Sequence, residues 1–254
     1  MNYSTLIFDA FDTVVHINES KLPAYPIDGT LVHTTAPAVH DAYIEHFGKL
    51  DFDVFYRAFS QSFTKVNALR YSDLKEIPSQ ERFRVMLGIL GHDASGVDAE
   101  ILVRLTEAHM AQLRQAFEVR TETVQVLNWA KDRFRTAMIS NFGYAPALYA
   151  TLDHFGIRSA FETVVISVEV GWCKPHRIIF ERALDRMKIH PSEALFIGDQ
   201  LYVDVYGALN CGIDVVWIET ERQDRLPEQP PKPTYTVRSL SEVVPLLEKR
   251  NGLR

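Results

Sequence analysis

Near its start the chain reads Thr5-Leu6-Ile7-Phe8-Asp9-Ala10-Phe11-Asp12-Thr13. An apolar run this short, bounded by polar residues, is more typical of a buried strand than of a helix. In an open parallel sheet, ligands and reactive groups gather just beyond the carboxyl ends of the strands. Asp9 follows the apolar run directly, so we expect its carboxylate to lie at such an end.

Three later stretches place polar residues in comparable positions. Residues 135–141 (RTAMISN) form an apolar run that ends in a hydroxyl, and residues 171–175 (GWCKP) place a lysine directly before a proline that can begin a helix. Residues 194–199 (ALFIGD) form a further apolar run that ends in an acid, and Asp204 follows it. Aspartate, serine, lysine and a pair of acids, in this order, resemble the haloacid dehalogenase-like (HAD) hydrolase superfamily. The resemblance covers almost the whole chain.

The composition is that of an ordinary globular protein, and it excludes several classes of function. With 254 residues and a formal net charge of −6, the chain lacks the basic surface that binding to nucleic acid or to an anionic membrane requires. Its two cysteines are too few for a disulfide framework, which favours a reducing compartment. No apolar run approaches the length that crosses a bilayer. We therefore expect a cytoplasmic protein that binds neither nucleic acid nor membrane.

A mostly helical insert is predicted between the first strand and the rest of the sheet. Residues 16–36 contain two prolines and a glycine, which predict a long loop or a short excursion of the chain. Apolar residues then recur at steps of three and four, and this pattern predicts helices over residues 37–47, 52–66, 83–90 and 102–117. His109 falls on the apolar stripe of the last helix, and we interpret it as a core or rim residue and not as a metal ligand.

From residue 121 onward, helical and strand patterns alternate, which predicts a parallel sheet with covering helices. The later strands are expected at residues 136–139, 163–166, 194–197, 214–218 and 235–237. The predicted fold is α/β, with a doubly wound, Rossmann-like core built from residues 1–16 and 120–254. The resemblance implies that residues 17–119 form a helical cap domain, which in this family closes over the active site and selects the substrate.

The candidate residues suit the chemistry of phosphoryl transfer. Acids that converge on one crevice repel each other unless a cation compensates them, and Mg²⁺ is the natural cation for carboxylate and phosphate oxygens. The resemblance implies that Asp9 is both the nucleophile and a metal ligand. It also implies that Asp199 and Asp204 are metal carboxylates and that the backbone carbonyl of Phe11 is a further ligand.

The remaining candidates would hold an anionic substrate. A lysine supplies a point charge and a hydroxyl supplies a hydrogen bond to a phosphate. The resemblance assigns the transferring group to Ser140 and Lys174, and adjacent contacts to Thr13 and Asn141. The expected partner is a small anionic molecule, most simply a phosphorylated metabolite, and the protein is expected to be a monomer or a homodimer.

The first stretch departs from the phosphatase pattern at Phe11. Phosphatases of this family carry an aspartate two residues after the nucleophile as general acid and base, and losing such a group typically costs about 10²–10⁴-fold in rate. The neighbouring Asp12 is the candidate substitute. An aromatic residue at this position is typical of the family's haloacid dehalogenases, so dehalogenation is one alternative. A phospho-ligand-binding module without catalysis is the other, whereas Asp199 and Asp204 favour metal-dependent phosphoryl hydrolysis.

Overall fold

The chain folds into two compact units. The computed structural model describes residues 3–27, 29–220, 223, 225 and 229–251. One unit contains the chain up to His16 and from Glu118 onward, and the other contains Ile17–Phe117. Where the chain passes from one unit to the other and back, β2 (His16–Ile17) and β5 (Phe117–Glu118) form a two-stranded sheet.

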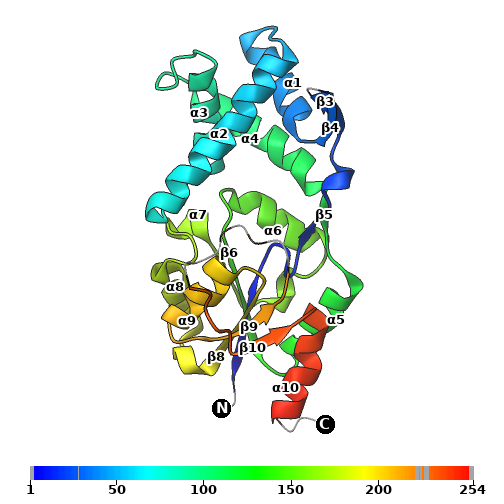
Figure 1. Cartoon of the computed structure of the whole chain (residues 1–254), viewed down its shortest axis with the longest axis vertical. Coiled ribbons are helices and arrows are strands. Elements are labelled where there is room, and N and C mark those ends of the chain that lie inside the picture. Colours follow the sequence, from blue (N-terminus) through cyan, green and yellow to red (C-terminus); the bar gives the residue numbers. More distant parts are fainter. Residues whose placement is uncertain (1–2, 28, 221–222, 224, 226–228, 252–254) are drawn as a thin grey trace. The chain divides into compact units, whose positions relative to one another are not determined.

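The first unit is built on a six-stranded parallel sheet (Figure 1). Its strands, in the order β10-β9-β8-β1-β6-β7, are β10 (Tyr235–Val237), β9 (Asp214–Ile218), β8 (Ala194–Gly198), β1 (Thr5–Asp9), β6 (Arg135–Ser140) and β7 (Thr163–Ile166). β1 is central, and its residue Phe8 pairs with Met138 on one side and with Ile197 on the other. The strand order reverses beside β1, because β6 and β7 extend the sheet in one direction and β8 to β10 extend it in the other. Such a switch point is where ligands bind in open α/β sheets.

Helices cover both faces of this sheet. Figure 1 shows α8 and α9 on one side of the strands and α5 and α10 on the other. The helices of this unit are α5 (Thr121–Lys131), α6 (Ala145–His154), α7 (Ser167–Val170), α8 (Arg177–Met187), α9 (Gly207–Asn210) and α10 (Val243–Asn251). A π-helical turn, Leu201–Tyr206, precedes α9, and three short 3₁₀ turns lie at Arg158–Ala160, Pro191–Glu193 and Leu240–Glu242. The alternation of helix and strand produces the doubly wound arrangement.

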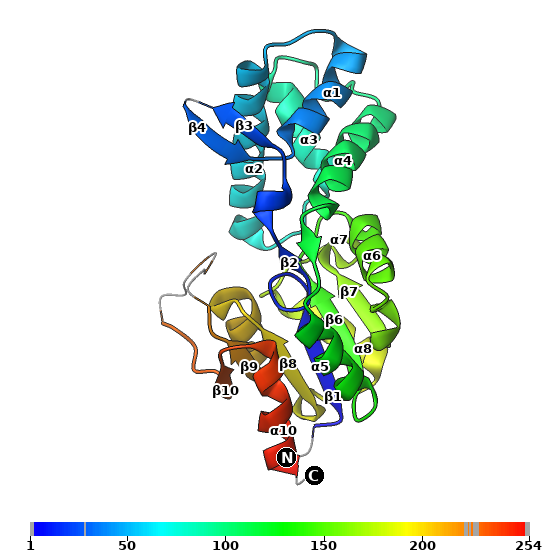
Figure 2. The ribbon, with the colours of Figure 1, turned by 90° about the vertical axis from the view of Figure 1, so that its right-hand side faces the viewer.

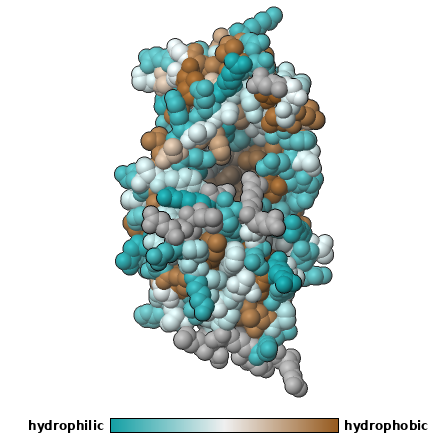
Figure 3. Space-filling view, in the orientation of Figure 1, coloured by the Kyte–Doolittle hydropathy of each residue, from teal (hydrophilic) through white to brown (hydrophobic). Residues whose placement is uncertain are grey.

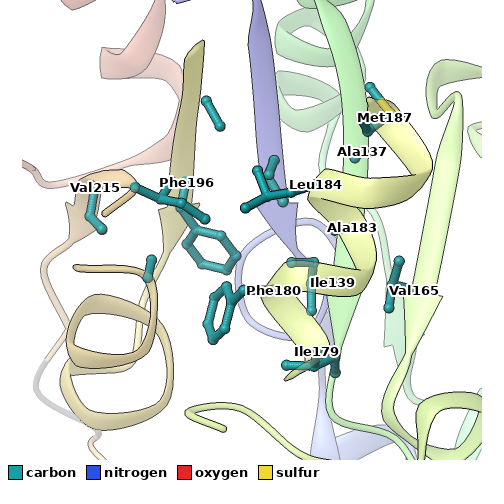
Figure 4. Close-up of a cluster of buried hydrophobic side chains, with 14 of the residues drawn as sticks. Ala137, Ile139, Val165, Ile179, Phe180, Ala183, Leu184, Met187, Phe196 and Val215 are labelled. Carbon is teal, nitrogen blue, oxygen red and sulfur yellow. The ribbon is translucent and has the colours of Figure 1, made fainter. Parts of the chain in front are cut away.

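The packing of α8 fixes the strands that carry the polar residues. Five of its apolar residues recur at helical spacing and are buried in the core: Ile179, Phe180, Ala183, Leu184 and Met187. Figure 4 shows Phe180 facing Phe196 of β8, and their ring centroids are 5.6 Å apart in an edge-to-face arrangement. A side chain of this size contributes roughly 1.5–3 kcal/mol when it is fully buried. This core holds the carboxyl ends of β1, β6 and β8 in register.

The second unit is mainly helical (Figure 2). Its helices are α1 (Ala36–Phe47), α2 (Phe52–Asp73), α3 (Ser79–Ile89) and α4 (Ala99–Arg114), and a 3₁₀ turn lies at Glu19–Lys21. α2 begins where Asp51 Oδ1 accepts hydrogen bonds from the backbone N–H groups of Asp53 and Val54, and it continues seven residues beyond the predicted end of its apolar stripe. The aromatic stripe of α2 is buried at Phe55 and Phe59 in the core of this unit.

The prediction for residues 16–36 missed two strands. A long loop or a short excursion was expected, but β3 (Ala24–Ile27) and β4 (Thr30–His33) form an antiparallel hairpin there. Most residues of this hairpin are exposed or half-buried, so its sequence lacks the apolar alternation by which a half-buried strand is recognised. The predicted fold class, a parallel α/β sheet with a helical insert, is confirmed.

The surface carries scattered apolar side chains. In Figure 3 hydrophobic and hydrophilic residues alternate over the face that is shown. The large apolar side chains that are exposed in the described ranges include Leu31, Phe63 and Leu69. None of the helices in those ranges combines the length and the apolar character that a membrane span needs.

Candidate active site

Two of the predicted acids lie at the carboxyl ends of neighbouring strands. Asp9 is the last residue of β1, and Asp199 follows the last residue of β8. Because Phe8 pairs with Ile197 across the two strands, both carboxylates emerge at the same edge of the sheet. One oxygen from each of Asp9, Asp199 and Asp204 lies within 4.8 Å of the others, and all three side chains are buried. The structure thus brings together three acids that are far apart in the sequence.

Asp204 reaches this group through a close contact with Gly198. A Cβ atom added at Gly198 would lie 2.6 Å from Asp204 Oδ2, so a larger residue at this position would displace the carboxylate. The backbone N–H of Gln200 donates a hydrogen bond to the same oxygen at 3.0 Å. Asp204 lies within the π-helical turn, and such turns occur frequently at functional sites.

Lys174 is buried between two of the acids. Its ammonium group donates hydrogen bonds to Asp9 Oδ1 and, at 2.6 Å, to Asp204 Oδ1. The loop that carries it is fixed by Asn141, whose Oδ1 accepts from the Lys174 backbone N–H at 2.7 Å and whose Nδ2 donates to the Lys174 carbonyl at 3.0 Å. The Asn141 side chain thus contacts the Lys174 backbone in this structure. A contact between Asn141 and a phosphate stays a prediction.

Two predicted hydroxyl groups lie in the same region. Ser140 ends β6, and its Oγ atom is buried with no hydrogen-bond partner among the described residues. Leaving a buried hydroxyl unsatisfied costs about 1–3 kcal/mol. Thr13 is also buried, and its hydroxyl donates a long hydrogen bond of 3.5 Å to Asp199 Oδ1. A ligand oxygen near Ser140 would satisfy its hydroxyl.

Burial and mutual repulsion perturb the acids. Burial raises the pKa of Asp9 to about 7, against the opposing charge of Lys174 and with a further contribution from Asp204. Burial, followed by the charges of Asp204 and Asp9, raises the pKa of Asp199 to about 8. Burial by itself would lower the pKa of Lys174, but the carboxylates of Asp204 and Asp9 more than offset it and hold the pKa above its usual value. Lys174 therefore stays charged, while Asp9 and Asp199 need more positive charge to be fully ionised at neutral pH.

The acids fit a divalent cation. When all three are ionised, the carboxylates around the one ammonium group carry an excess of negative charge, and their oxygens are already close to one another. Mg²⁺ prefers carboxylate, carbonyl and phosphate oxygens. Asp9, Asp199 and Asp204 would hold such an ion, and the predicted ligation by the Phe11 carbonyl stays a prediction.

The turn after β1 contains Phe11 and Asp12, whose side chains have different surroundings. The backbone N–H groups of Val14 and Val15 both donate to the Ala10 carbonyl, and Asp12 adopts a left-handed backbone conformation with φ of 61°. The ring of Phe11 packs on Phe142, with 4.9 Å between the centroids.

Asp12 lies in a more open environment than the buried acids. Its side chain is 44% exposed, and its carboxylate lies 4.0 Å from His16 Nδ1. The buried group of acids and Lys174 thus does not include Asp12.

Sequence reasoning missed the residues that support Asp199. The Gln200 side-chain amide donates to Asp199 Oδ2 at 2.5 Å, and the Asp199 backbone carbonyl accepts from Trp217 Nε1 at 2.9 Å and from Gln223 Nε2 at 3.0 Å. Adjacency to Asp199 was a signal for Gln200. Trp217 and Gln223 carry no such signal, because only the fold brings them to this position.

Comparison with known proteins places these residues in a family context. The hydrolase family described as haloacid dehalogenase-like hydrolase matches residues 27–212, which include Ser140, Lys174 and Asp199. The chain is 32% identical over 149 residues to the glyceraldehyde 3-phosphate phosphatase of Pyrococcus furiosus, covering 57% of this chain and 60% of that protein. It is also 32% identical over 149 residues to the pyrimidine 5'-nucleotidase YjjG of Escherichia coli, covering 58% of this chain and 64% of YjjG. The matched stretch thus spans less than two thirds of either relative.

Solved structures of similar proteins share the fold over nearly the whole chain. YfnB of Bacillus subtilis, named as a HAD-hydrolase and crystallised with magnesium, superposes with a TM-score of 0.63 at 19% identity, covering 97% of this chain and 99% of YfnB. A 2-haloacid dehalogenase from Pseudomonas syringae pv. Tomato gives a TM-score of 0.64 at 19% identity, covering 98% of this chain and 99% of that one. At this level of identity the likeness establishes the fold.

Proposed function

The chain belongs to the haloacid dehalogenase-like hydrolases, and we propose that it hydrolyses a small phosphorylated metabolite in an Mg²⁺-dependent reaction through an aspartyl-phosphate intermediate on Asp9. The observation that carries this proposal is the buried group of Asp9, Asp199, Asp204 and Lys174 at the carboxyl edge of the sheet. The two relatives at 32% identity are named as phosphatases of a sugar phosphate and of a nucleotide, which supports the same class of substrate.

In the proposed reaction Asp9 is the nucleophile. Its carboxylate attacks phosphorus, the bond from phosphorus to the leaving oxygen breaks on the opposite side, and water then hydrolyses the acyl phosphate to release inorganic phosphate. Lys174 and the hydroxyl groups of Ser140 and Thr13 hold the phosphoryl oxygens, while Asn141 positions the Lys174 loop. When bound to the acids, Mg²⁺ supplies the positive charge that offsets the phosphate oxygens.

Phe11 restricts the leaving group. Its side chain can neither protonate a departing oxygen nor activate water, and its ring packs on Phe142. Asp12 is the other acid of this turn, but its side chain is exposed and lies near His16. The proposed reaction is therefore fastest with substrates whose leaving group departs without protonation.

Phe11 also favours a second candidate function, which is the hydrolysis of a 2-haloacid. Displacement of halide by the Asp9 carboxylate needs no acid for the leaving group and no metal ion. The convergence of Asp199 and Asp204 on Asp9 supports phosphoryl hydrolysis over this alternative, because three converging carboxylates suit a divalent cation, which displacement of halide does not need.

Product analysis of the purified chain separates these candidates. A panel of phosphomonoesters and acyl phosphates and a panel of 2-haloacids would be assayed with Mg²⁺ and with EDTA, using the wild type, Asp9→Asn and Asp12→Asn. We expect phosphate release that requires Mg²⁺, is lost in Asp9→Asn and is retained in the matched control Asp12→Asn. Halide release in EDTA would replace the proposal with dehalogenation. Binding of phosphate compounds without turnover would replace it with a non-catalytic module.

A further inference from the structure

The helical unit contains a half-buried positive charge, Arg82, that the proposed reaction does not use. Arg82 lies on α3 with its guanidinium carbon 4.2 Å from the ring centroid of Phe59 and 5.2 Å from that of Phe63. Its Nε atom is inaccessible to solvent and has no hydrogen-bond partner among the described residues. Burial lowers the pKa of Arg82 to about 10, so the side chain remains protonated at neutral pH.

The protein groups around Arg82 do not compensate its charge. Its terminal nitrogens make two long contacts, one with His109 Nε2 and one with the Phe59 carbonyl, each at 3.4 Å. No carboxylate of the described ranges forms an ion pair with it, and no acid contributes to its lowered pKa. A buried charge without a counter-charge is costly, and folded proteins normally pair such a charge.

Another arginine of the same unit shows the usual arrangement. Arg70, on α2, donates to the carboxylate of Glu76 at 2.8 Å, and the Glu76 side chain is 1% exposed. Arg70 therefore has a counter-charge, whereas Arg82 has none among the residues that the structure describes.

His109 shapes the surroundings of Arg82 without balancing its charge. Burial, and then the charge of Arg82, lower the pKa of His109 to about 3, so the imidazole is neutral. Since the guanidinium only donates, Nε2 of His109 accepts from Arg82 and Nδ1 donates to Thr35 Oγ1 at 2.7 Å. The Thr35 hydroxyl can therefore donate its own proton to another acceptor.

From this geometry we propose that the helical unit contains an oxyanion-binding site at Arg82, which binds a phosphate or carboxylate group of a ligand. The guanidinium matches two oxygens of such a group, and anions of either kind form its strongest hydrogen bonds. Phe59 lies buried against the guanidinium, and Phe63, which is 52% exposed, gives the site an open side. The ligand supplies the negative charge that the described residues do not provide at Arg82.

The test follows the imidazole of His109, because this ring contacts Arg82 directly. The full chain in EDTA would be titrated with inorganic phosphate or with malonate up to about 20 mM, a range that detects millimolar dissociation constants. The His109 resonance is assigned with His109→Gln. The matched control is Arg84→Gln, which removes an arginine of the same helix that pairs with Glu81 on the surface. Arg82→Gln removes the proposed site.

We expect a saturable shift of the His109 resonance in the wild type and in Arg84→Gln, with binding at least about tenfold weaker in Arg82→Gln. Saturation with phosphate only, or with malonate only, identifies the chemical class of the ligand. Thermal unfolding checks the fold of each variant, and Arg82→Lys takes the place of Arg82→Gln if the latter does not fold. Absence of a saturable shift with both anions, or an equal shift without Arg82, would overturn the proposal. The readout needs neither turnover nor metal, so its result is independent of the proposed hydrolysis.

Discussion

Lys174 in the α/β unit and Arg82 in the helical unit are both enclosed cations, but their surroundings are opposite in charge. Lys174 contacts two carboxylates, and a third lies within reach of the same point. Arg82 contacts aromatic rings, a neutral imidazole and a backbone carbonyl. One region therefore has an excess of negative charge and the other has an excess of positive charge.

This difference indicates which ligand completes each region. Buried charges are stable when they are paired, so an excess of either sign marks a place where a ligand of the opposite sign binds favourably. The acids around Lys174 fit a divalent cation, and in the proposed reaction a phosphate group would bind beside it. Arg82 calls for an anion.

Removing the Lys174 charge from the acidic region should change the free energy of unfolding more than any other substitution proposed for the two regions. Lys174→Met leaves Asp9 and Asp204 without their buried partner, which typically destabilises a protein by about 3–5 kcal/mol. We expect this loss in the free energy of unfolding at pH 8 in EDTA, measured by urea denaturation, together with loss of hydrolysis. At pH 5 the loss should be smaller, because Asp9, whose pKa is raised to about 7, is then protonated and needs no partner.

The matched control is Lys131→Met, at the exposed end of α5. We expect its free energy of unfolding to stay within about 0.5 kcal/mol of the wild type. Equal stability of Lys174→Met and Lys131→Met at pH 8 would show that the acids are not ionised around Lys174, and the comparison with Arg82 would lose its basis.

The second prediction adds an acid to the region that already has an excess of negative charge. Phe11→Asp introduces the general acid that the turn lacks, so hydrolysis of alkyl phosphates should rise by about 10²-fold. Acyl phosphates should change little, because their leaving group departs without protonation. Steady-state rates for both substrates in Mg²⁺ test this, with Phe11→Asn as the uncharged control. An equal gain with Phe11→Asn would attribute the effect to lost packing on Phe142.

The sequence predicted much of the acidic region, and the reason is geometric. Short apolar runs that end in Asp9, Ser140 and Asp199 identify strand ends, and a parallel sheet collects all strand ends at one edge. Their roles in catalysis stay predictions. The sequence did not reveal Gln223 or the π-helical turn at residues 201–206, because neither has a periodicity that differs from an ordinary loop or helix.

Arg82 was not predicted, for a related reason. The helical pattern of residues 83–90 records which positions are apolar, and it does not record how far a neighbouring arginine is enclosed by aromatic rings. That enclosure arises from Phe59 on another helix, so it depends on the packing of α2 against α3. His109 was interpreted as a core or rim residue, but its hydrogen bond to Thr35 could not be derived from spacing.

The third prediction uses pH to separate the two regions. The pKa values of Asp9 and Asp199 are raised from 3.8 to about 7 and about 8. Between pH 3.8 and these raised values, the folded state therefore binds more protons than the unfolded state. The free energy of unfolding without metal should fall as pH rises through this window, by up to about 1.4 kcal/mol per pH unit for each proton. Mg²⁺ should reduce this slope.

His109 acts in the opposite direction. Its pKa is lowered from 6.5 to about 3, so the unfolded state binds the extra proton, and this contribution to stability is lost as pH falls through that window. The free energy of unfolding, measured by urea denaturation from pH 4 to pH 8, should therefore fall less steeply toward low pH in His109→Gln. In Asp199→Asn it should fall less steeply toward high pH. If both variants changed the pH dependence on the same side, acidic or alkaline, the assignment of opposite charge to the two regions would be contradicted.

The smallest effect is expected from removing the uncompensated cation itself. Arg82→Met keeps a long side chain against Phe59, loses two hydrogen bonds of 3.4 Å and removes an unpaired charge. These contributions oppose each other, so the free energy of unfolding should change by less than about 1 kcal/mol. Arg70→Met should cost more, because it leaves the buried carboxylate of Glu76 without its partner. Urea denaturation of both variants at pH 7 measures the difference. Equal losses would assign Arg82 a structural role like that of Arg70, whereas a small loss at Arg82 means that its charge contributes little to folding and is available to bind an anion.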